Sequence, residues 1–230
     1  MNDNRAILVT GLLLMLTLTV FESTSLDLLV QDRLYDPVRG WSINRDAPLP
    51  KLIFYDGPKI GIGVIGAFLV LCLAVPASKA ARLPLSRKEA AFLLVCLGVV
   101  PFAAGVLKDT TGVFGPWKLA RYGGEQPFRN LLESIPHVAG QERGRGFPAA
   151  HCSGAFALMG LYFVGKGRSA RRLGLACGLV AGWIVGVYQI LKGAHYLSHT
   201  IVTMLLAWLI VQLLARAFGL GRSARDERAA

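Results

Sequence analysis

Acidic residues and recognisable metal-binding patterns are both scarce in this chain of 230 residues. Only 14 residues are Asp or Glu, against 25 that are Lys or Arg. The charged fraction of 17% is below the roughly 25% of a typical soluble domain. The four cysteines form no CxxC pair and the chain has no H-E-x-x-H motif, so neither a disulfide framework nor a zinc site is favoured.

Long apolar stretches are what the chain has instead. Hydrophobic residues make up 53% of it, and the mean hydropathy is +0.49. Each stretch approaches the roughly 20 residues needed to cross about 30 Å of hydrocarbon, and none alternates as a barrel strand would. We predict an all-α fold, a six-transmembrane-helix bundle that forms one domain over residues 1–230. The predicted spans are about 6–21, 60–77, 90–107, 153–165, 173–191 and 200–218.

Basic residues cluster in the short segments that flank these spans. They are Arg5, Lys79, Arg82, Arg87, Lys88, Lys166, Arg168, Arg171, Arg172, Arg216, Arg222, Arg225 and Arg228. If the chain crosses the membrane six times, all of these basic residues fall on one side of it. The positive-inside rule identifies that side as cytoplasmic. Segments 22–59, 108–152 and 192–199 are then external. Topology accounts for the net charge of +11, so we expect the bilayer, and no nucleic acid, as a partner.

The first external segment contains an amphipathic stretch. Residues 25–34 have the pattern of a helix that lies along the membrane interface, with Ser25 or Asp27 as its N-cap. Several prolines and glycines downstream prevent a longer helix. We expect this external amphipathic segment to shield the mouth of a site.

The first candidate site is the run Pro148-Ala149-Ala150-His151, which leads into the fourth apolar span. The unpaired amide groups of a helix start, at its positive dipole end, form an anion site, here near Ala149 and Ala150. His151 is placed to protonate a leaving oxygen, because the unperturbed pKa of histidine is near neutrality. The alternative is a histidine that only caps the helix or lines the interface.

The second candidate site follows the fifth span, in Gly193-Ala194-His195-Tyr196-Leu197-Ser198-His199. If this turn is helical, the rings of His195 and His199 share one face, and one can orient the other. A histidine held in this way can act as a nucleophile toward phosphorus. A zinc pair is the alternative, although only His151 is available as a third ligand.

Cations accompany both histidine segments on the external side. Lys108 ends the third span, Arg121 follows in the next loop, Arg145 precedes His151, and Lys192 precedes His195. This placement runs against the positive-inside bias, and an anionic substrate explains it. For the two lysines the alternative is snorkelling toward headgroups. Arg129 and His137 are interpreted as ordinary loop residues.

Together these residues resemble the type-2 phosphatidic acid phosphatase superfamily of metal-independent lipid phosphatases, whose motifs are K-x6-R-P, P-S-G-H and S-R-x5-H-x3-D. Lys108 and Pro116 match the first motif, with Gly115 in place of arginine. Proline and histidine of the second motif are present, with alanines between them. In the third, His195 takes the nucleophile position, Gln189 stands in place of arginine and His199 in place of aspartate.

The resemblance implies a phosphatase that acts on a lipid-linked phosphate without a metal or other cofactor. His195 would be the nucleophile, His151 the general acid, His199 its orienting neighbour and Lys108 a phosphate ligand. Arg121, Arg145 or Lys192 would supply the missing guanidinium function. It also implies a bacterial inner membrane location, with the site on the periplasmic or external face.

Two other functions stay open at this point. The same intermediate allows transfer of phosphate to another lipid. The departures from the motifs also allow a non-catalytic transporter or lipid-binding protein on this scaffold. Lipid A, undecaprenyl pyrophosphate and phosphatidylglycerophosphate are all candidate substrates, and the sequence defines neither the choice among them nor the oligomeric state.

Overall fold

The computed structural model describes residues 3–76, 83–131, 133 and 143–220, and nearly all regular structure in them is helical. The longer helices are α1 (Asp3–Ser23), α4 (Gly57–Ala74), α6 (Arg87–Thr111), α9 (Gly167–Leu191) and α10 (Leu197–Ala217). The shorter ones are α2 (Leu26–Asp32), α3 (Pro48–Lys51), η1 (Leu52–Asp56), η2 (Pro116–Lys118), η3 (Ala120–Tyr122), α7 (Ala150–Ala157), η4 (Leu158–Gly160) and α8 (Leu161–Val164). Two short antiparallel strands, β1 (Tyr35–Asp36) and β2 (Gly40–Trp41), form a hairpin.

Five helices in the described part of the chain are long and apolar enough to cross a membrane. They are α1, the continuous run Pro48–Ala74, α6, α9 and α10. The predicted fourth span corresponds to the shorter apolar run Ala150–Val164, made of α7, η4 and α8. The structure therefore confirms a helical protein with several candidate spans, but by length and apolar character it supports five of the six.

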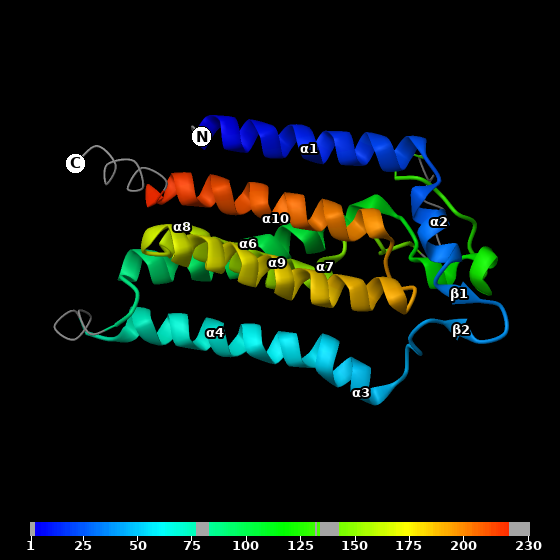
Figure 1. The fold of residues 1–230 in the computed structure, drawn as a ribbon, viewed down its shortest axis with the longest axis horizontal. Helices are drawn as coiled ribbons and strands as arrows, with labels where there is room; N and C mark the ends of the chain where they lie inside the picture. The colour runs from blue at the N-terminus through cyan, green and yellow to red at the C-terminus, as the bar shows by residue number, and fades with distance from the viewer. Residues whose placement is uncertain (1–2, 77–82, 132, 134–142, 221–230) are drawn as a thin grey trace.

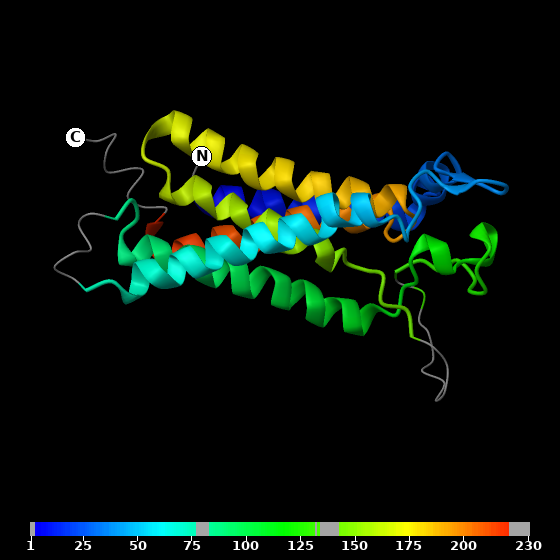
Figure 2. The ribbon, with the colours of Figure 1, turned by 90° about the horizontal axis from the view of Figure 1, so that it is seen from below.

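The long helices run side by side along one axis (Figures 1 and 2). One end of this bundle holds the start of α1, the end of α4, the α8–α9 junction and the end of α10 (Figure 1). The opposite end holds α2, the β1–β2 hairpin and the starts of α7 and α10 (Figure 1). The basic flanking residues that the structure describes thus lie at the end away from the candidate histidines.

Close packing of α9 against the α7–α8 segment depends on a row of glycines. Gly174, Gly178 and Gly182 recur every four residues and therefore share one face of α9. A Cβ at Gly178 would lie 2.3 Å from the backbone nitrogen of Met159, and one at Gly182 would lie 2.1 Å from the Phe156 ring. Small residues of this kind let membrane helices approach closely.

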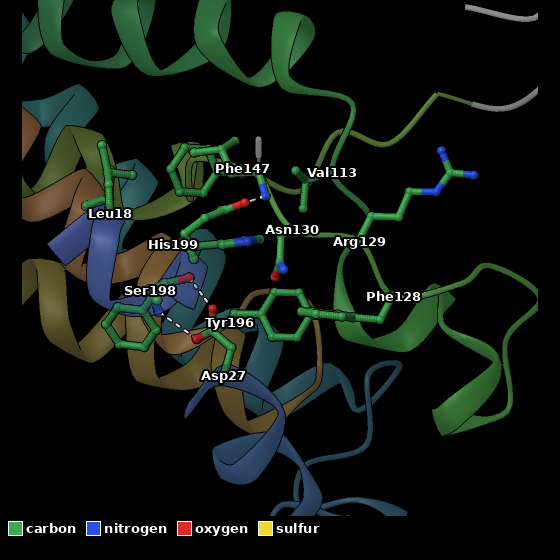
Figure 3. A pocket seen from close by; sticks show the side chains of 14 residues that line it. Leu18, Asp27, Val113, Phe128, Arg129, Asn130, Phe147, Tyr196, Ser198 and His199 are labelled. Carbon is green, nitrogen blue, oxygen red and sulfur yellow. Dashed lines mark hydrogen bonds between the residues drawn. The ribbon is translucent and has the colours of Figure 1, made fainter. Parts of the chain in front are cut away.

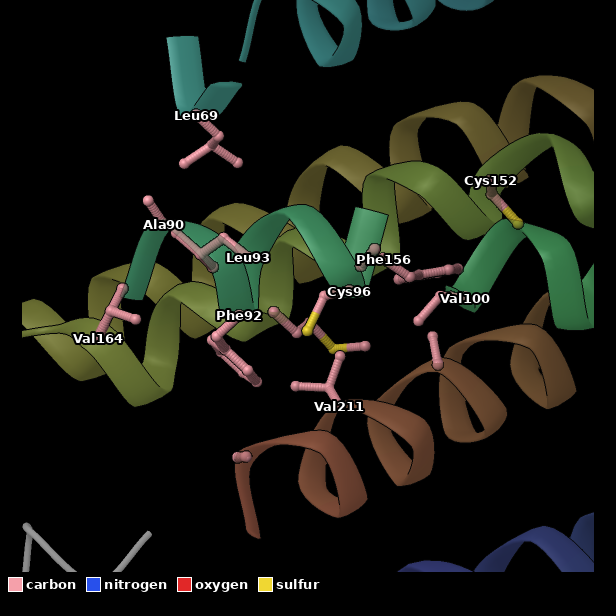
Figure 4. Packing of buried hydrophobic residues seen from close by; sticks show 14 of the residues in the cluster. Leu69, Ala90, Phe92, Leu93, Cys96, Val100, Cys152, Phe156, Val164 and Val211 are labelled. Carbon is pink, nitrogen blue, oxygen red and sulfur yellow. The ribbon is translucent and has the colours of Figure 1, made fainter. Parts of the chain in front are cut away.

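The apolar core joins α6, α7 and α10 in the middle of the bundle (Figure 4). Its best buried members include Phe92, Cys96, Phe156 and Val211, all at most 1% exposed. The cluster includes Cys152 in the first turn of α7 and Val211 in α10, so it anchors both helices to α6. The first turns of α7 and α10 carry candidate histidines.

Candidate active site

Three imidazole rings converge at the end of the bundle that also holds α2. His151 lies in the first turn of α7, His195 in the turn between α9 and α10, and His199 in the first turn of α10. Ring centroids are 5.3 Å apart for His151 and His195, and 5.7 Å apart for His195 and His199. Within the described ranges, no three His, Cys, Asp or Glu side chains are grouped so that they could hold a metal ion.

The turn that carries His195 is held by backbone hydrogen bonds and by one close approach. The amides of Ala194 and His195 both donate to the carbonyl of Gln189, at 2.9 and 3.3 Å. Gly193 has φ +70, and a Cβ there would lie 2.2 Å from the ring of Trp41. Only glycine satisfies both conditions, so this position fixes the path of the chain into His195.

Burial keeps the imidazole of His195 in its neutral form. Its side chain is 2% exposed, and desolvation, followed by the neighbouring His199, His151 and Lys108, holds its pKa well below the ordinary 6.5. The ring is therefore neutral at neutral pH and keeps a lone pair. Its Nδ1 lies 3.4 Å from Nδ1 of His199, and the backbone of Gly146 is a hydrogen-bonding neighbour of both rings.

A buried carboxylate from α2 supports the start of α10. Asp27 accepts the backbone amide of Ser198 at 2.9 Å and also the Ser198 hydroxyl, at the edge of a small pocket that His199 lines (Figure 3). Burial raises the pKa of Asp27 to about 6. Gln31, also on α2, donates from its side-chain amide to the carbonyl of His195 at 2.9 Å.

This arrangement corrects the expected N-cap of the amphipathic helix. Ser25 precedes α2 but makes no capping hydrogen bond with its side chain, and Asp27 caps α10 in place of its own helix. Asp27 is 8% exposed and Gln31 is fully buried, so this face of α2 packs on the histidine turn. The hydrophobic periodicity predicted the helix. It did not predict the polar contacts of the helix, because the partner residues lie about 170 residues away in sequence.

Lysines surround the more accessible histidine. The positive charges that act on half-buried His151 are those of Lys108, Lys192 and Lys59. The ring of Tyr55 packs on His151 at 5.2 Å between centroids. Nζ of Lys59 lies 3.6 Å, and Nζ of Lys192 5.3 Å, from the centroid of that tyrosine ring. A negative ligand beside His151 would therefore meet several cations.

Lys59 and Tyr55 are site residues that the sequence reasoning missed. Both residues lie near the end of the predicted external segment 22–59, and neither was among the candidate site residues. A signal was present, because the two are four residues apart at the external start of a predicted span and therefore share a helix face. Nothing in the sequence showed that this face meets His151.

The glycine that replaces the arginine of the first motif has a steric cause. A Cβ at Gly115 would lie 2.4 Å from the carbonyl oxygen of Ala194, so no larger side chain fits while the backbone keeps this path. The amide of Trp117 donates to the carbonyl of Gly193 at 2.9 Å in the same contact. The loop after α6 thus packs directly on the His195 turn, and the missing guanidinium has no room here.

The two predicted arginine ligands are both held by carboxylates. Arg121 donates to both oxygens of Asp32 on α2, at 2.8 and 2.7 Å, and the Tyr122 hydroxyl donates to the same carboxylate. The expected phosphate contact of Arg121 is therefore not supported, because its guanidinium is already paired. Arg145 forms an exposed pair with Asp109 at 2.7 Å, near enough to Lys108 to act on it electrostatically.

The predicted amide site at the start of α7 also needs correction. The amide of Ala149 donates to the Thr203 hydroxyl at 2.9 Å, and that of Ala150 donates to the carbonyl of Pro148 at 2.9 Å. Both amides are therefore already used. Gln189 differs, because its side chain is 1% exposed and neither of its amide atoms has a hydrogen-bond partner among the described residues.

The comparison with known families agrees with this geometry. The sequence model of the PAP2 superfamily matches residues 89–221, which is more than half of the chain and includes α6 to α10 with all three histidines. No curated protein matches the chain. No solved structure matches it either. A family match of this extent, over the helices that carry the converging histidines, shows that the chain belongs to the PAP2 superfamily.

Proposed function

We propose that this protein is a membrane phosphatase that removes phosphate from a lipid-linked phosphate or pyrophosphate. Members of its superfamily are phosphatases, and this membership supports phosphoester hydrolysis. The observation that carries the proposal is the neutral, buried ring of His195, with the His151 ring at 5.3 Å and lysine charges around the pair. A nucleophile, a proton donor and cations are the parts that phosphoryl transfer requires.

The proposed reaction has two steps. Nδ1 of His195 faces His199, which leaves Nε2 to attack phosphorus. A P–N bond forms while the P–O bond to the lipid breaks. His151, which takes up a proton from water when the negative charge of the bound phosphate offsets the surrounding lysines, gives that proton to the leaving oxygen. Water then attacks the phosphohistidine and loses a proton to His151. The P–N bond breaks, phosphate leaves, and both histidines return to their starting states.

Charge on the transferred phosphoryl group would be neutralised by Lys108 and Lys192, with Lys59 at the outer edge. Both lysines act on the His151 ring, and burial lowers the pKa of Lys192, which favours a close anionic partner. The side-chain amide of Gln189, which has no hydrogen-bond partner in the described part of the chain, would donate a further hydrogen bond in place of the motif arginine. Arg145 at the rim would guide anions toward Lys108.

We further propose that the chain is a single domain that crosses a bacterial inner membrane six times, with the site on the external face. The run Ala150–Val164 has 15 residues, about 22 Å of helix, and would complete the fourth crossing together with the loop before it. The basic residues at the other end of the bundle favour a cytoplasmic location for that end. α2 and the β1–β2 hairpin would then form the external segment.

The test is phosphate release from a panel of lipid phosphates by the purified protein in detergent, with EDTA present. We expect turnover by the wild type, and a loss of at least about a thousandfold in His195→Ala and His151→Ala. Lys166→Ala, at the opposite end of the bundle, is the matched control. Activity that survives both histidine substitutions would refute the mechanism, and transfer of labelled phosphate to a second lipid would identify a phosphotransferase.

A further inference from the structure

An apolar groove runs along the outer face of α9. It begins next to the lysine and histidine cluster and extends toward the opposite end of the bundle. Its volume is about 440 Å³, and its walls are almost entirely hydrocarbon. Residues from η1 and α9 line it, among them Phe54, Val180, Trp183, Ile184, Val187 and Tyr188. The bundle's own helices leave this groove open.

The length of the groove matches one leaflet of a bilayer. Its α9 wall extends from Val180 to Leu191, which is eleven steps of 1.5 Å, or about 16 Å. The hydrocarbon core of a bilayer is about 30 Å thick, so this is about half of it. A chain in the groove would begin at the interface and end near the middle of the membrane.

The upper end of the groove is continuous with the charged site. Phe54 stacks on Tyr188 at 5.7 Å between centroids, and Nζ of Lys192 lies 4.7 Å from the centroid of the Tyr188 ring. The same ammonium group lies 5.3 Å from the ring of Tyr55, which in turn packs on His151. The surface therefore changes from hydrocarbon to cation within one turn of α9, as an amphiphile with an anionic head requires.

We propose that this groove holds one hydrocarbon chain of the phosphorylated lipid whose phosphate lies between Lys192 and His151. The inference rests on the proposed function and adds to it a substrate class, a lipid of the leaflet next to the site with a chain long enough to fill the groove. A chain that moves from the bilayer into the groove exchanges one apolar environment for another, so it gains little from the hydrophobic effect. Its contribution is close packing, which orients the phosphate for attack.

Chain-length preference provides the first test. Ile184→Trp fills the middle of the groove, and Val64→Trp adds the same side chain at a similar depth on the exposed face of α4. With dihexadecanoyl phosphatidic acid, Ile184→Trp should lower kcat/KM about tenfold, which is about 1.4 kcal/mol. With dihexanoyl phosphatidic acid it should change less than twofold, and Val64→Trp should change neither. An equal effect on both lipids, or the same effect from Val64→Trp, would overturn the proposal.

A binding measurement separates this inference from the proposed catalysis. Trp183 lines the groove, so lipids brominated along their chains should quench its fluorescence. The fluorescence of Trp183 is obtained by subtracting the emission of the His195→Ala, Trp183→Phe double variant from that of the His195→Ala protein. Brominated phosphatidic acid should quench it saturably, and unlabelled long-chain phosphatidic acid should compete. If brominated phosphatidylcholine quenched the fluorescence equally and unlabelled phosphatidic acid did not compete, the assignment of the groove to the substrate would be wrong, even in an active enzyme. If the wild type showed no turnover, the proposed function would be refuted instead.

Discussion

At the scale of single residues, His199 stands where the family motif has a carboxylate, and this changes the protonation state expected of His195. A carboxylate would stabilise a charged imidazole, whereas here burial and neighbouring positive groups keep the pKa of His195 well below 6.5. The two Nδ1 atoms lie 3.4 Å apart, so a neutral pair can share one proton between them. The backbone of Gly146 is the other orienting neighbour. The imidazole of His195 is therefore neutral at neutral pH, as the proposed attack on phosphorus requires.

The proposed contact between Lys192 and the phosphate is tested by a pair of alanine substitutions. Lys192→Ala should lower kcat/KM about a hundredfold, because it removes a charge that stabilises the transferred phosphoryl group. Arg121→Ala should stay within about threefold of wild type, because its guanidinium is paired with Asp32 on an exposed surface. Both are measured as phosphate release from one lipid under identical detergent conditions. A hundredfold loss in Arg121→Ala would restore it as a phosphate ligand.

Asp27 should make stability depend on pH. Burial raises its pKa from 3.8 to about 6, so the folded protein keeps a proton that the unfolded chain has lost between these values. Stability contributed by this group therefore falls as pH rises from about 4 to about 6, by about 3 kcal/mol in total. The difference in apparent Tm between the wild type and Asp27→Asn should therefore decrease across this range and stay constant at higher pH.

The measurement for Asp27 is thermal unfolding of both proteins in detergent at several pH values. His195 titrates with the opposite sign, since its pKa is lowered by folding, but it is present in both proteins and cancels in the difference. Asp27→Asn retains one oxygen that can accept the amide of Ser198. Parallel Tm profiles for the two proteins would show that Asp27 does not titrate in this window.

At the scale of elements, α2 and the α9–α10 turn form one unit. Asp27 holds the start of α10, Gln31 holds the carbonyl of His195, and Asp32 holds Arg121 in the loop after α6. A helix of seven residues thus bonds to two segments that carry the site. Its isolated stability would be marginal, so it is the tertiary contacts that stabilise it.

The turn between α9 and α10 is tested at Gly193, with Gly167 as a matched control. Both have positive φ, but a Cβ at Gly193 would meet the ring of Trp41, whereas no atom of the described residues lies within 4 Å of a Cβ at Gly167. Gly167→Ala costs only the backbone strain, about 1 kcal/mol, or about 3 °C in apparent Tm. Gly193→Ala should lower Tm at least about twice as much and kcat/KM at least about tenfold.

The Gly193 experiment combines thermal unfolding with phosphate release from one lipid. Because the activity loss comes from a displaced His195 and not from global unfolding, it should persist at temperatures well below Tm. Equal behaviour of the two alanine variants would show that the close approach of Trp41 does not constrain the turn.

At the scale of the whole molecule, the two ends of the bundle differ in chemistry. One end carries those flanking arginines and lysines that the structure describes, and the other carries the three converging histidines, α2 and the hairpin (Figure 1). Between them, outward-facing apolar side chains such as Leu12 and Met15 on α1 and Val70 on α4 remain exposed at more than 50%. Such a surface requires hydrocarbon around it.

The orientation of the molecule can be measured with single cysteines. Val38→Cys lies in the hairpin turn at 94% exposure, and Ser169→Cys lies at the exposed start of α9. In spheroplasts, a membrane-impermeant maleimide should label Val38→Cys, and it should label Ser169→Cys only after permeabilisation. The unsubstituted protein, with its four native cysteines, sets the background. The reverse pattern would place the site on the cytoplasmic face.

Hydrophobic length and residue order determined the helical class, the positions of the long helices and the segments that carry His151 and His195. These are local properties, because a run of apolar residues must satisfy its backbone within itself in a membrane. The same local analysis counted 153–165 as a span, but the observed run Ala150–Val164 has only 15 residues and falls short of the other five helices. The close packing of the α9 glycines against α7–α8 depends on residues distant in sequence, so periodicity alone did not indicate it.

Tertiary structure alone decided which charges meet which rings. Three of these contacts join segments that are far apart in sequence. They are the pairing of Arg121 with Asp32, the capping of α10 by Asp27 and the approach of Lys59 to His151. Charge by itself attracts any opposite partner within reach, so the choice between a carboxylate and a phosphate depends on packing. The chain sequence determined that cations and histidines lie on one side of the bundle, and the fold decided which of them remain available to a ligand.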